Sequence, residues 1–471
     1  MNSLFKVNFN WGVYILLLIA ITLLWPGLSW YSLIAFAISL FQFILLFNSF
    51  GSVIPIRYLA GTLMCVQMLV GPAFAYNGLD AYQYMTYQMK IPEDTYFQYV
   101  IPAVALFILG LHVTAGKLKG EVLDKKAVMH YVDNSGNLPY IFIGVGFVAS
   151  LVAGFFGSGL TFVFVLLSNA KFIGLFMLLM GSKKLKLVPI IVVMGSIIID
   201  ALSIAMFHDL LVWFIMLGAI ISIKYQFKFI VKATATAAFI LTAVIIQQLK
   251  KDYRQSAGIE GAGLDTFEKV YKDQSQDKSL FSYEKLAASN VRINQGYIIT
   301  NIMTTVPDRV PFENGKEMMR ILEAAFLPRI IAPNKLNAGD REIFMKYTGL
   351  GLRKGTSMGL SSVGDAYINF GVIGGSIFMF FLGLAFSEVL NAFEKYSKQF
   401  PFLLLFTPLV FYYPIRPDCE LQTTLGHLVK SCMLIYFVIL FWRKDLTQIT
   451  TKKQKPQEVL NSEIISSRGI V

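Results

Sequence analysis

The chain has 471 residues, of which 55% are hydrophobic and only 15% are charged. Soluble globular proteins have about 25% charged residues, so this composition excludes a soluble enzyme, a disordered chain and a fibrous repeat. The net charge of +12 gives no specific support for nucleic-acid binding, because membrane proteins usually carry such an excess in cytoplasmic loops. We therefore expect a protein that crosses a membrane several times and binds no nucleic acid.

Long apolar runs recur along the chain, and most approach the roughly 20 residues that a membrane-spanning helix needs. The runs lie at 11–26, 29–49, 54–76, 96–115, 139–156, 159–181, 187–207, 209–223, 227–248, 371–391, 401–415 and 425–442. They predict an all-α polytopic membrane protein with about 12 transmembrane helices, nine in residues 1–248 and three in residues 371–443. The first run lacks a signal-cleavage exit, so we expect it to be retained as a span.

The distribution of lysine predicts which side of the membrane each segment faces. Lysines gather at 117–128, 183–186, 224–232 and in the tail at 444–471, and all of these fall on one side if the spans number twelve. The alternate segments 77–95 and 157–158 are poor in Lys and Arg. We therefore expect both termini to be cytoplasmic and the long interruption at 249–370 to be extracytoplasmic.

The segment 249–370 is predicted to be partly helical. Apolar residues recur at helical spacing from Asn290 to Thr304 and from Lys316 to Phe326, which predicts two amphipathic helices. Residues 327–355 are rich in Pro, Gly and Asn and are expected to be irregular. The segment also concentrates Arg and Lys, whose side chains bind phosphate oxygens well. The alternative is that these charges belong to an ordinary solvated surface.

Three motifs occur in a fixed order from this segment into the next span. The first is Arg292-Ile-Asn294-Gln295-Gly296-Tyr297, at the expected start of a helix. The second runs from Pro328-Arg329 to Pro333-Asn-Lys335, and the third is Gly364-Asp365-Ala-Tyr367-Ile-Asn369-Phe370-Gly371. This order resembles the Wzy-type polymerases of O-antigen and other oligosaccharide repeat units. The chain departs from the family pattern at Leu336, where Pro is expected, and at Asp365, where Glu is common.

The resemblance implies a glycosyltransferase of the bacterial cytoplasmic membrane. It would join undecaprenyl-diphosphate-linked oligosaccharide repeat units at the outer face, within the lipid bilayer, with a chain-length regulator and a flippase as partners. An O-antigen ligase, which uses the same kind of donor, remains an alternative, and a lipid-linked oligosaccharide flippase or a secretion-channel subunit is a more distant one. The choice between O-antigen, capsule and exopolysaccharide stays open.

The candidate residues follow from charge and from the resemblance. For binding of the diphosphate and glycan we predict Arg292, Asn294, Arg329, Lys335, Arg353, Tyr367, Asn369 and Arg416. For the general base that takes the acceptor's proton we predict Asp365, His427 or Asp418. Asp365 has an alternative role as a helix cap, Arg416 as an interfacial anchor and His427 as a structural residue.

No metal or cofactor is predicted. The three cysteines and four histidines show no metal-ligand spacing, and the loop has no paired-aspartate motif. Two ionisable residues, Lys171 and Asp200, lie inside predicted spans, where an ion pair between them is one expectation and helix packing is the default role.

Overall fold

The computed structural model describes residues 9–79, 87–115, 123–155, 158–182, 187–205, 207–277, 282–327, 331–332, 334–337, 339–353 and 356–451. Within these ranges every regular element is helical and no strand is present. In these described ranges, ten helices are long and apolar enough to cross a membrane. The chain is therefore an all-α polytopic membrane protein, as its composition predicts.

The ten long apolar segments correspond to ten of the twelve predicted runs. They are α2 (Trp30–Ser49), α3 to α4 (Ile56–Tyr76), α5 (Glu93–Val113), α7 with η4 (Leu138–Phe155), α8 to α9 (Phe162–Met180), α10 (Leu187–Ile204), α11 (His208–Tyr225), the Phe229–Lys250 part of α12, α18 (Ser361–Ser397) and the Leu421–Arg443 part of α20. The other two runs form shorter elements: α1 (Trp11–Leu24), and η5 (Pro401–Phe406) followed by α19 (Thr407–Val410). Pro401 and Pro408 lack a backbone donor, which favours a short helix there.

The segment between the ninth and tenth predicted spans is largely helical. The helix α12 continues to Glu260, and it is followed by α13 (Leu264–Asp277), α14 (Tyr283–Ile293), α15 (Gly296–Thr305), α16 (Lys316–Phe326) and α17 (Arg341–Thr348). The bounds of α16 match the prediction. The prediction of a continuous helix over 290–304 is wrong, because the chain leaves the helix between α14 and α15. The prediction of an irregular 327–355 is wrong at α17, whereas the other described residues of that range form no regular element.

Short polar side chains explain both the break between α14 and α15 and the presence of α17. Asn294 has extended backbone angles, and its Oδ1 accepts a hydrogen bond from the Gly296 amide at 2.9 Å, which separates α14 from α15. Asp340 caps α17 by accepting from the Glu342 and Ile343 amides at 2.9 and 3.3 Å. Both residues are of types that favour a helix start, because a short polar side chain satisfies the free backbone donors.

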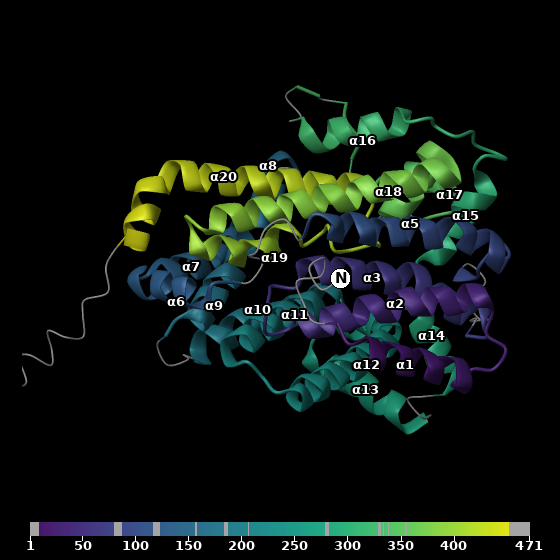
Figure 1. Cartoon of the computed structure of the whole chain (residues 1–471), viewed down its shortest axis with the longest axis horizontal. Helices are drawn as coiled ribbons and strands as arrows, with labels where there is room; N and C mark the ends of the chain where they lie inside the picture. The colour runs from purple at the N-terminus through teal and green to yellow at the C-terminus, as the bar shows by residue number, and fades with distance from the viewer. Residues whose placement is uncertain are drawn as a thin grey trace, which may run out of the picture.

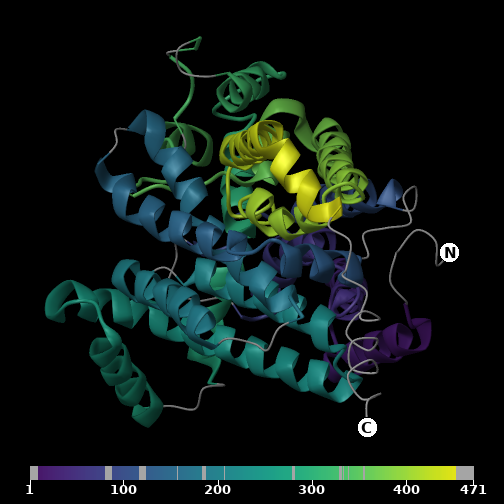
Figure 2. The same cartoon turned by 90° about the vertical axis from the view of Figure 1, so that its left-hand side faces the viewer.

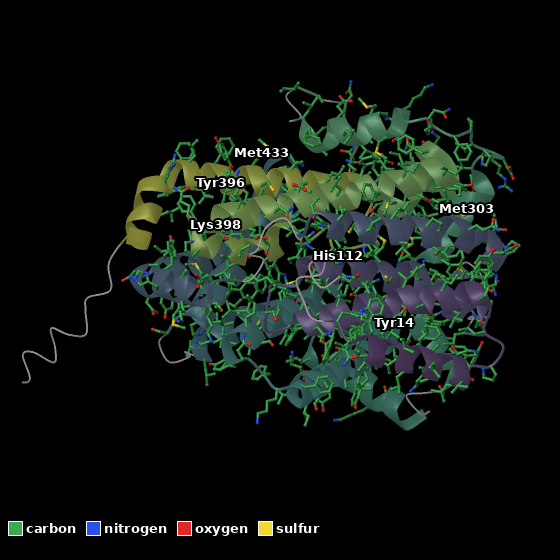
Figure 3. All side chains as sticks on the ribbon, in the orientation of Figure 1. Tyr14, His112, Met303, Tyr396, Lys398 and Met433 are labelled. Atoms are coloured by element: carbon green, nitrogen blue, oxygen red, sulfur yellow. The ribbon has the colours of Figure 1, made fainter. Side chains whose placement is uncertain are left out.

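Most helices run side by side along the long axis of the molecule (Figure 1). The two ends of this bundle differ in chemistry. We call the end that carries α14 to α17 the loop end. At the other end, the lysine end, Lys224 donates to the Gly181 carbonyl, Lys125 to the Lys224 carbonyl and Lys232 to the Phe50 carbonyl. Each of these lysines thereby caps a helix C-terminus. Figure 3 labels Lys398 at this end and Met303 toward the loop end.

The helices α5 and α18 form the most extensive pairing in the fold, and two glycines make it close. A Cβ added to Gly110 would lie 2.1 Å from the Phe380 carbonyl oxygen, and one added to Gly383 would lie 2.2 Å from that of Phe107. Small residues at such contacts let helix backbones approach closely. This pair fixes α18, whose first turns carry the third sequence motif.

Viewed along the bundle, α12 and α13 lie toward one edge of the molecule (Figure 2).

A π-helical segment, η1 (Val66–Val70), anchors the first sequence motif. The Gln67 carbonyl accepts a hydrogen bond from the Gln295 amide at 3.1 Å, and the Met68 carbonyl accepts from the Tyr96 hydroxyl at 2.8 Å. A π-bulge frees carbonyl oxygens from the helix ladder, so they are available to distant donors. The position of Arg292, three residues before Gln295, is therefore set partly by α3 to α4.

Candidate functional site

The turn before the last helix brings together charges from several parts of the chain. The Arg416 guanidinium lies 3.1 Å from the Asp418 carboxylate and 3.4 Å from that of Asp209, in the first turn of α11. The same guanidinium lies 5.3 Å from the centre of the Tyr413 ring. The Arg416 side chain is 11% exposed and that of Asp418 is 29% exposed. The pair therefore lies at the boundary between the protein and its surroundings.

Four cations gather at this turn, at the loop end of the bundle. Lys250 lies within electrostatic range of Arg254, Arg292 and Arg416, and of the Asp418 carboxylate. Lys250 and Arg254 lie on consecutive turns of α12, and Arg292 lies in the last turn of α14. We call Lys250, Arg254, Arg292 and Arg416 the cation cluster. Most of the charges that act on Lys250 are positive, so the cluster is not neutralised by Asp418.

The polar atoms of the cluster are incompletely paired within the described part of the chain. Lys250 and Arg292 make no hydrogen bond or ion pair there. Three buried atoms beside them also have no hydrogen-bond partner: Arg416 Nε, Asp418 Oδ1 and His208 Nε2. Buried polar atoms are nearly always paired, and each unpaired one costs about 1–3 kcal/mol. Their concentration in one place indicates a site that binds a polar group.

Electrostatics keep the Asp418 carboxyl ionised. Its removal from water alone raises the pKa, but the neighbouring Arg416 guanidinium, together with His208, outweighs that effect and holds the pKa of Asp418 below its usual value. The turn therefore carries a carboxylate at neutral pH. This carboxylate faces Arg416 through Oδ2 and leaves Oδ1 without a partner in the described structure.

Acidic residues gather on the other side of the same turn. Glu420 accepts hydrogen bonds from the Gly339 amide at 2.6 Å and the Thr423 hydroxyl at 2.9 Å, and burial raises its pKa. Asp365, at the start of α18, accepts from the Leu421 amide at 2.8 Å. Glu317 in α16 lies within electrostatic range of Asp365. Contacts of two acidic side chains therefore hold the end of this turn, at Glu420 and Leu421.

Most residues of the predicted motifs hold helix ends together. Asn369 accepts from the Met318 amide at 3.0 Å, near the start of α16. Tyr367 donates to the Val306 carbonyl at 3.4 Å, and its ring lies 5.1 Å from that of Tyr99. Lys335 donates to the Ala324 carbonyl at 3.0 Å and so caps the end of α16. Asn294 joins α14 to α15 by accepting from the Gly296 amide, and the other three side chains connect the loop helices to neighbouring segments.

The remaining predicted residues are placed separately. His427 is buried in α20, donates from Nε2 to the Leu409 carbonyl at 2.8 Å, and packs with its ring centre 5.0 Å from that of Tyr413. Arg353 is exposed. Arg329 lies outside the described residues. Of the eight predicted binding residues, the structure brings Arg292 and Arg416 together in the cation cluster.

Sequence reasoning missed the other members of the cluster. Lys250 and Arg254 sit at the end of a predicted span and resemble ordinary boundary charges, and His208 and Asp209 are at the start of another. One signal was present: α12 carries Lys250 and Arg254 four residues apart, so both lie on one helix face. In the described residues, no group of three His, Cys, Asp or Glu side chains is placed to hold a metal ion.

Most of the cation cluster lies in a region that this chain shares with a protein family. Residues 74–411 match the family DUF8712, described as a domain of unknown function. The chain belongs to this family. The match includes Lys250, Arg254, Arg292 and Asp365, and it ends before Arg416. Neither the curated proteins nor the solved structures contain a match.

The expected pair between the two intramembrane charges is present. Lys171 Nζ lies 3.8 Å from Asp200 Oδ2, and the same amine lies 5.3 Å from the centre of the Phe147 ring. The Lys171 side chain is buried whereas that of Asp200 is exposed on α10. This pair joins α9 to α10 and includes no member of the cation cluster.

Proposed function

We propose that this DUF8712 protein is a polysaccharide polymerase, a glycosyltransferase that joins undecaprenyl-diphosphate-linked oligosaccharide repeat units. The observation that carries the proposal is the cation cluster, in which Lys250 lies within electrostatic range of Arg254, Arg292 and Arg416, beside unpaired buried polar atoms. A diphosphate diester carries one negative charge on each phosphate. Arg and Lys groups that are fixed before binding suit such a leaving group, because they stabilise charge as it develops.

The orientation that fits this function follows from the positive-inside rule. The lysine end would face the cytoplasm and the loop end would face outward, across the bacterial cytoplasmic membrane, with the two shorter helical runs completing twelve spans. Both termini would then be cytoplasmic. The cation cluster would lie at the outer surface, where repeat units are joined on their lipid carrier.

The proposed reaction is a direct displacement at the anomeric carbon of the donor. The acceptor hydroxyl oxygen forms a bond to that carbon as the bond to the diphosphate oxygen breaks. The electron pair of the broken bond leaves with undecaprenyl diphosphate, whose charge is held by Arg292, Arg416, Lys250 and Arg254. The hydroxyl proton passes to a carboxylate at the turn.

Among the three predicted bases, Asp418 is favoured by its surroundings. Its carboxylate lies within the cation cluster, remains ionised and leaves Oδ1 without a partner in the described residues. Asp365 and His427 each hold a backbone group of another segment. We assign these two a positioning role. Asp365 holds the start of α20, and His427 holds α19 against α20.

The direct test is a reaction with purified full-length protein in vesicles. The substrate is the lipid-linked repeat unit, and the products are lipid-linked chains of increasing length together with released undecaprenyl diphosphate. We expect one undecaprenyl diphosphate to be released for each repeat unit that is added to a chain. Release of the carrier without chain growth, or no reaction with any lipid-linked repeat unit that the host makes, would overturn the proposal.

A further inference from the structure

Two apolar cavities lie next to each other beside α1. The first, of about 670 Å³, is lined by α4, α12 and α14 and includes Val244 and Leu286. The second, of about 420 Å³, is lined by α1, α2 and α3 and includes Leu40 and Phe43. Trp25 and Phe74 line both, with their rings stacked at 5.6 Å. The two cavities therefore adjoin at this aromatic pair, and we call them the first and second chambers of one groove.

The groove runs from the loop end toward the middle of the membrane. Phe43 lies 13 residues beyond Trp30, the first residue of α2, which corresponds to about 20 Å along the helix. That distance is about two thirds of the roughly 30 Å hydrocarbon core of a bilayer. A groove of this length and apolar lining fits a long hydrocarbon chain better than a small polar ligand. The helix α1, which borders it, has no buried residue, so the groove has only a thin wall on that side.

The wide end of the groove lies beside the cation cluster. Ile293 lines the first chamber, and Arg292 precedes it in the same turn of α14. Val244 lines the same chamber, and Lys250 lies six residues further along α12, about 9 Å toward the loop end. The chamber also has a polar edge at Asn290, whose buried Oδ1 has no hydrogen-bond partner among the described residues. The cation cluster, the polar edge at Asn290 and the apolar groove thus follow one another in the same order as the charged head and the apolar tail of an amphipathic lipid.

We propose that this groove binds the polyprenyl tail of the lipid-linked donor while its diphosphate binds at the cation cluster. This inference rests on the proposed function for the identity of the lipid. The tail would lie against the stacked Trp25 and Phe74 rings as it passes from the first chamber to the second. Tail binding places the diphosphate against Arg292 and Lys250, because the head of the lipid cannot move away without withdrawing the tail.

The test compares a long-tailed and a short-tailed diphosphate. Binding of undecaprenyl diphosphate and of isopentenyl diphosphate is measured on full-length protein in phosphatidylcholine nanodiscs. The variant Val244→Trp fills the first chamber, and Leu241→Trp is the matched control, since Leu241 is on the same helix, is 44% exposed and does not line the groove. We expect Val244→Trp to weaken undecaprenyl diphosphate binding about tenfold or more, because overpacking a site costs about 1–3 kcal/mol. Isopentenyl diphosphate binding should stay unchanged, because its tail is too short to reach Val244, about 9 Å from Lys250 along α12.

Three results would overturn the inference. They are equal binding of undecaprenyl diphosphate by the two tryptophan variants, equal binding of the long and short diphosphates by the wild type, and equally tight competition by phosphatidylglycerol. Failure of the proposed function gives a different result, in which the groove binds undecaprenyl diphosphate as expected but the protein makes no chain from lipid-linked repeat units. The two proposals can therefore fail separately.

Discussion

Asp365 accepts a hydrogen bond from the backbone amide of Leu421 at 2.8 Å, and this contact joins the start of α18 to the start of α20. Leu421 is the first residue of α20, so its amide has no partner within that helix. The turn that carries Arg416 and Asp418 comes immediately before it. The motif that contains Asp365 therefore positions the candidate site through a helix end.

Replacement of Asp365 by Asn separates this positioning role from a role as general base. The amide Oδ1 of Asn still accepts from the Leu421 amide, so we expect Asp365→Asn to fold and to retain polymer formation. Asp365→Ala loses the acceptor and should lower the free energy of unfolding by about 0.5–2 kcal/mol, the usual cost of a lost cap. Thermal unfolding in detergent and glycan length in cells measure the two effects. A folded but inactive Asp365→Asn variant would instead identify Asp365 as the proton acceptor.

Removal of Arg292 tests the cation cluster. A charge-assisted hydrogen bond contributes about 1.5–3 kcal/mol, so we expect Arg292→Ala to reduce chain growth about tenfold to a hundredfold while membrane insertion and protein level stay normal. The matched control is Arg353→Ala, which removes an exposed cation from the same loop. Glycan length and immunoblotting of membranes give the readouts. Wild-type chains from Arg292→Ala would remove this residue from the site.

The Arg416–Asp418 pair predicts a pH-dependent difference in stability. The pKa of Asp418 is lower in the folded protein than in the unfolded chain, where it is about 3.9. The ionised pair therefore stabilises the fold fully at neutral pH, and this contribution is lost as the pH falls below about 4. Asp418→Asn lacks it at every pH. We expect a lower Tm for Asp418→Asn at pH 7, with the gap to wild type closing toward pH 3. A gap that stays constant with pH would show that the pair's charge is not responsible.

The packing of α5 on α18 predicts that the effect of replacing a helix glycine on stability depends strongly on its position. A leucine at Gly110 would collide with the Phe380 carbonyl, so Gly110→Leu should prevent stable folding. Gly218 in α11 has no atom within 4 Å of an added Cβ. Gly218→Ala should therefore be neutral or stabilising by up to about 1 kcal/mol, since alanine favours a helix over glycine. Detergent-solubilised yield and Tm compare the two. Equal behaviour of the variants would contradict the close contact.

The apolar runs were sufficient to predict the fold class, because hydrophobic length is read directly from the sequence. Ten of the twelve runs became long helices, and α16 began and ended where its apolar spacing indicated. The break at Asn294 and the helix α17 were missed because their capping side chains are short polar residues that are equally common in loops. Asn294 and Asp340 reveal their roles only when the amides that they accept from are placed.

The candidate site was only partly predictable, because it is assembled from distant segments. Arg292 and Arg416 could be selected by residue type, but their meeting with Lys250 depends on how α12 and α14 pack beside the last turn. By contrast, Asn369 and Lys335 have the residue types expected of a binding site, yet the structure uses them to hold the two ends of α16. The sequence shows which chemical groups these side chains carry, whereas their roles depend on their neighbours in the folded protein.

The central claim, that this protein polymerises lipid-linked repeat units, is tested most directly by the length distribution of glycans in a strain that lacks it. Lipid-linked and finished surface glycans are separated and sized. We predict that only single repeat units remain, including surface acceptors that carry one unit each. Long chains that accumulate on the carrier lipid and never reach their acceptor would contradict the claim and indicate a ligase.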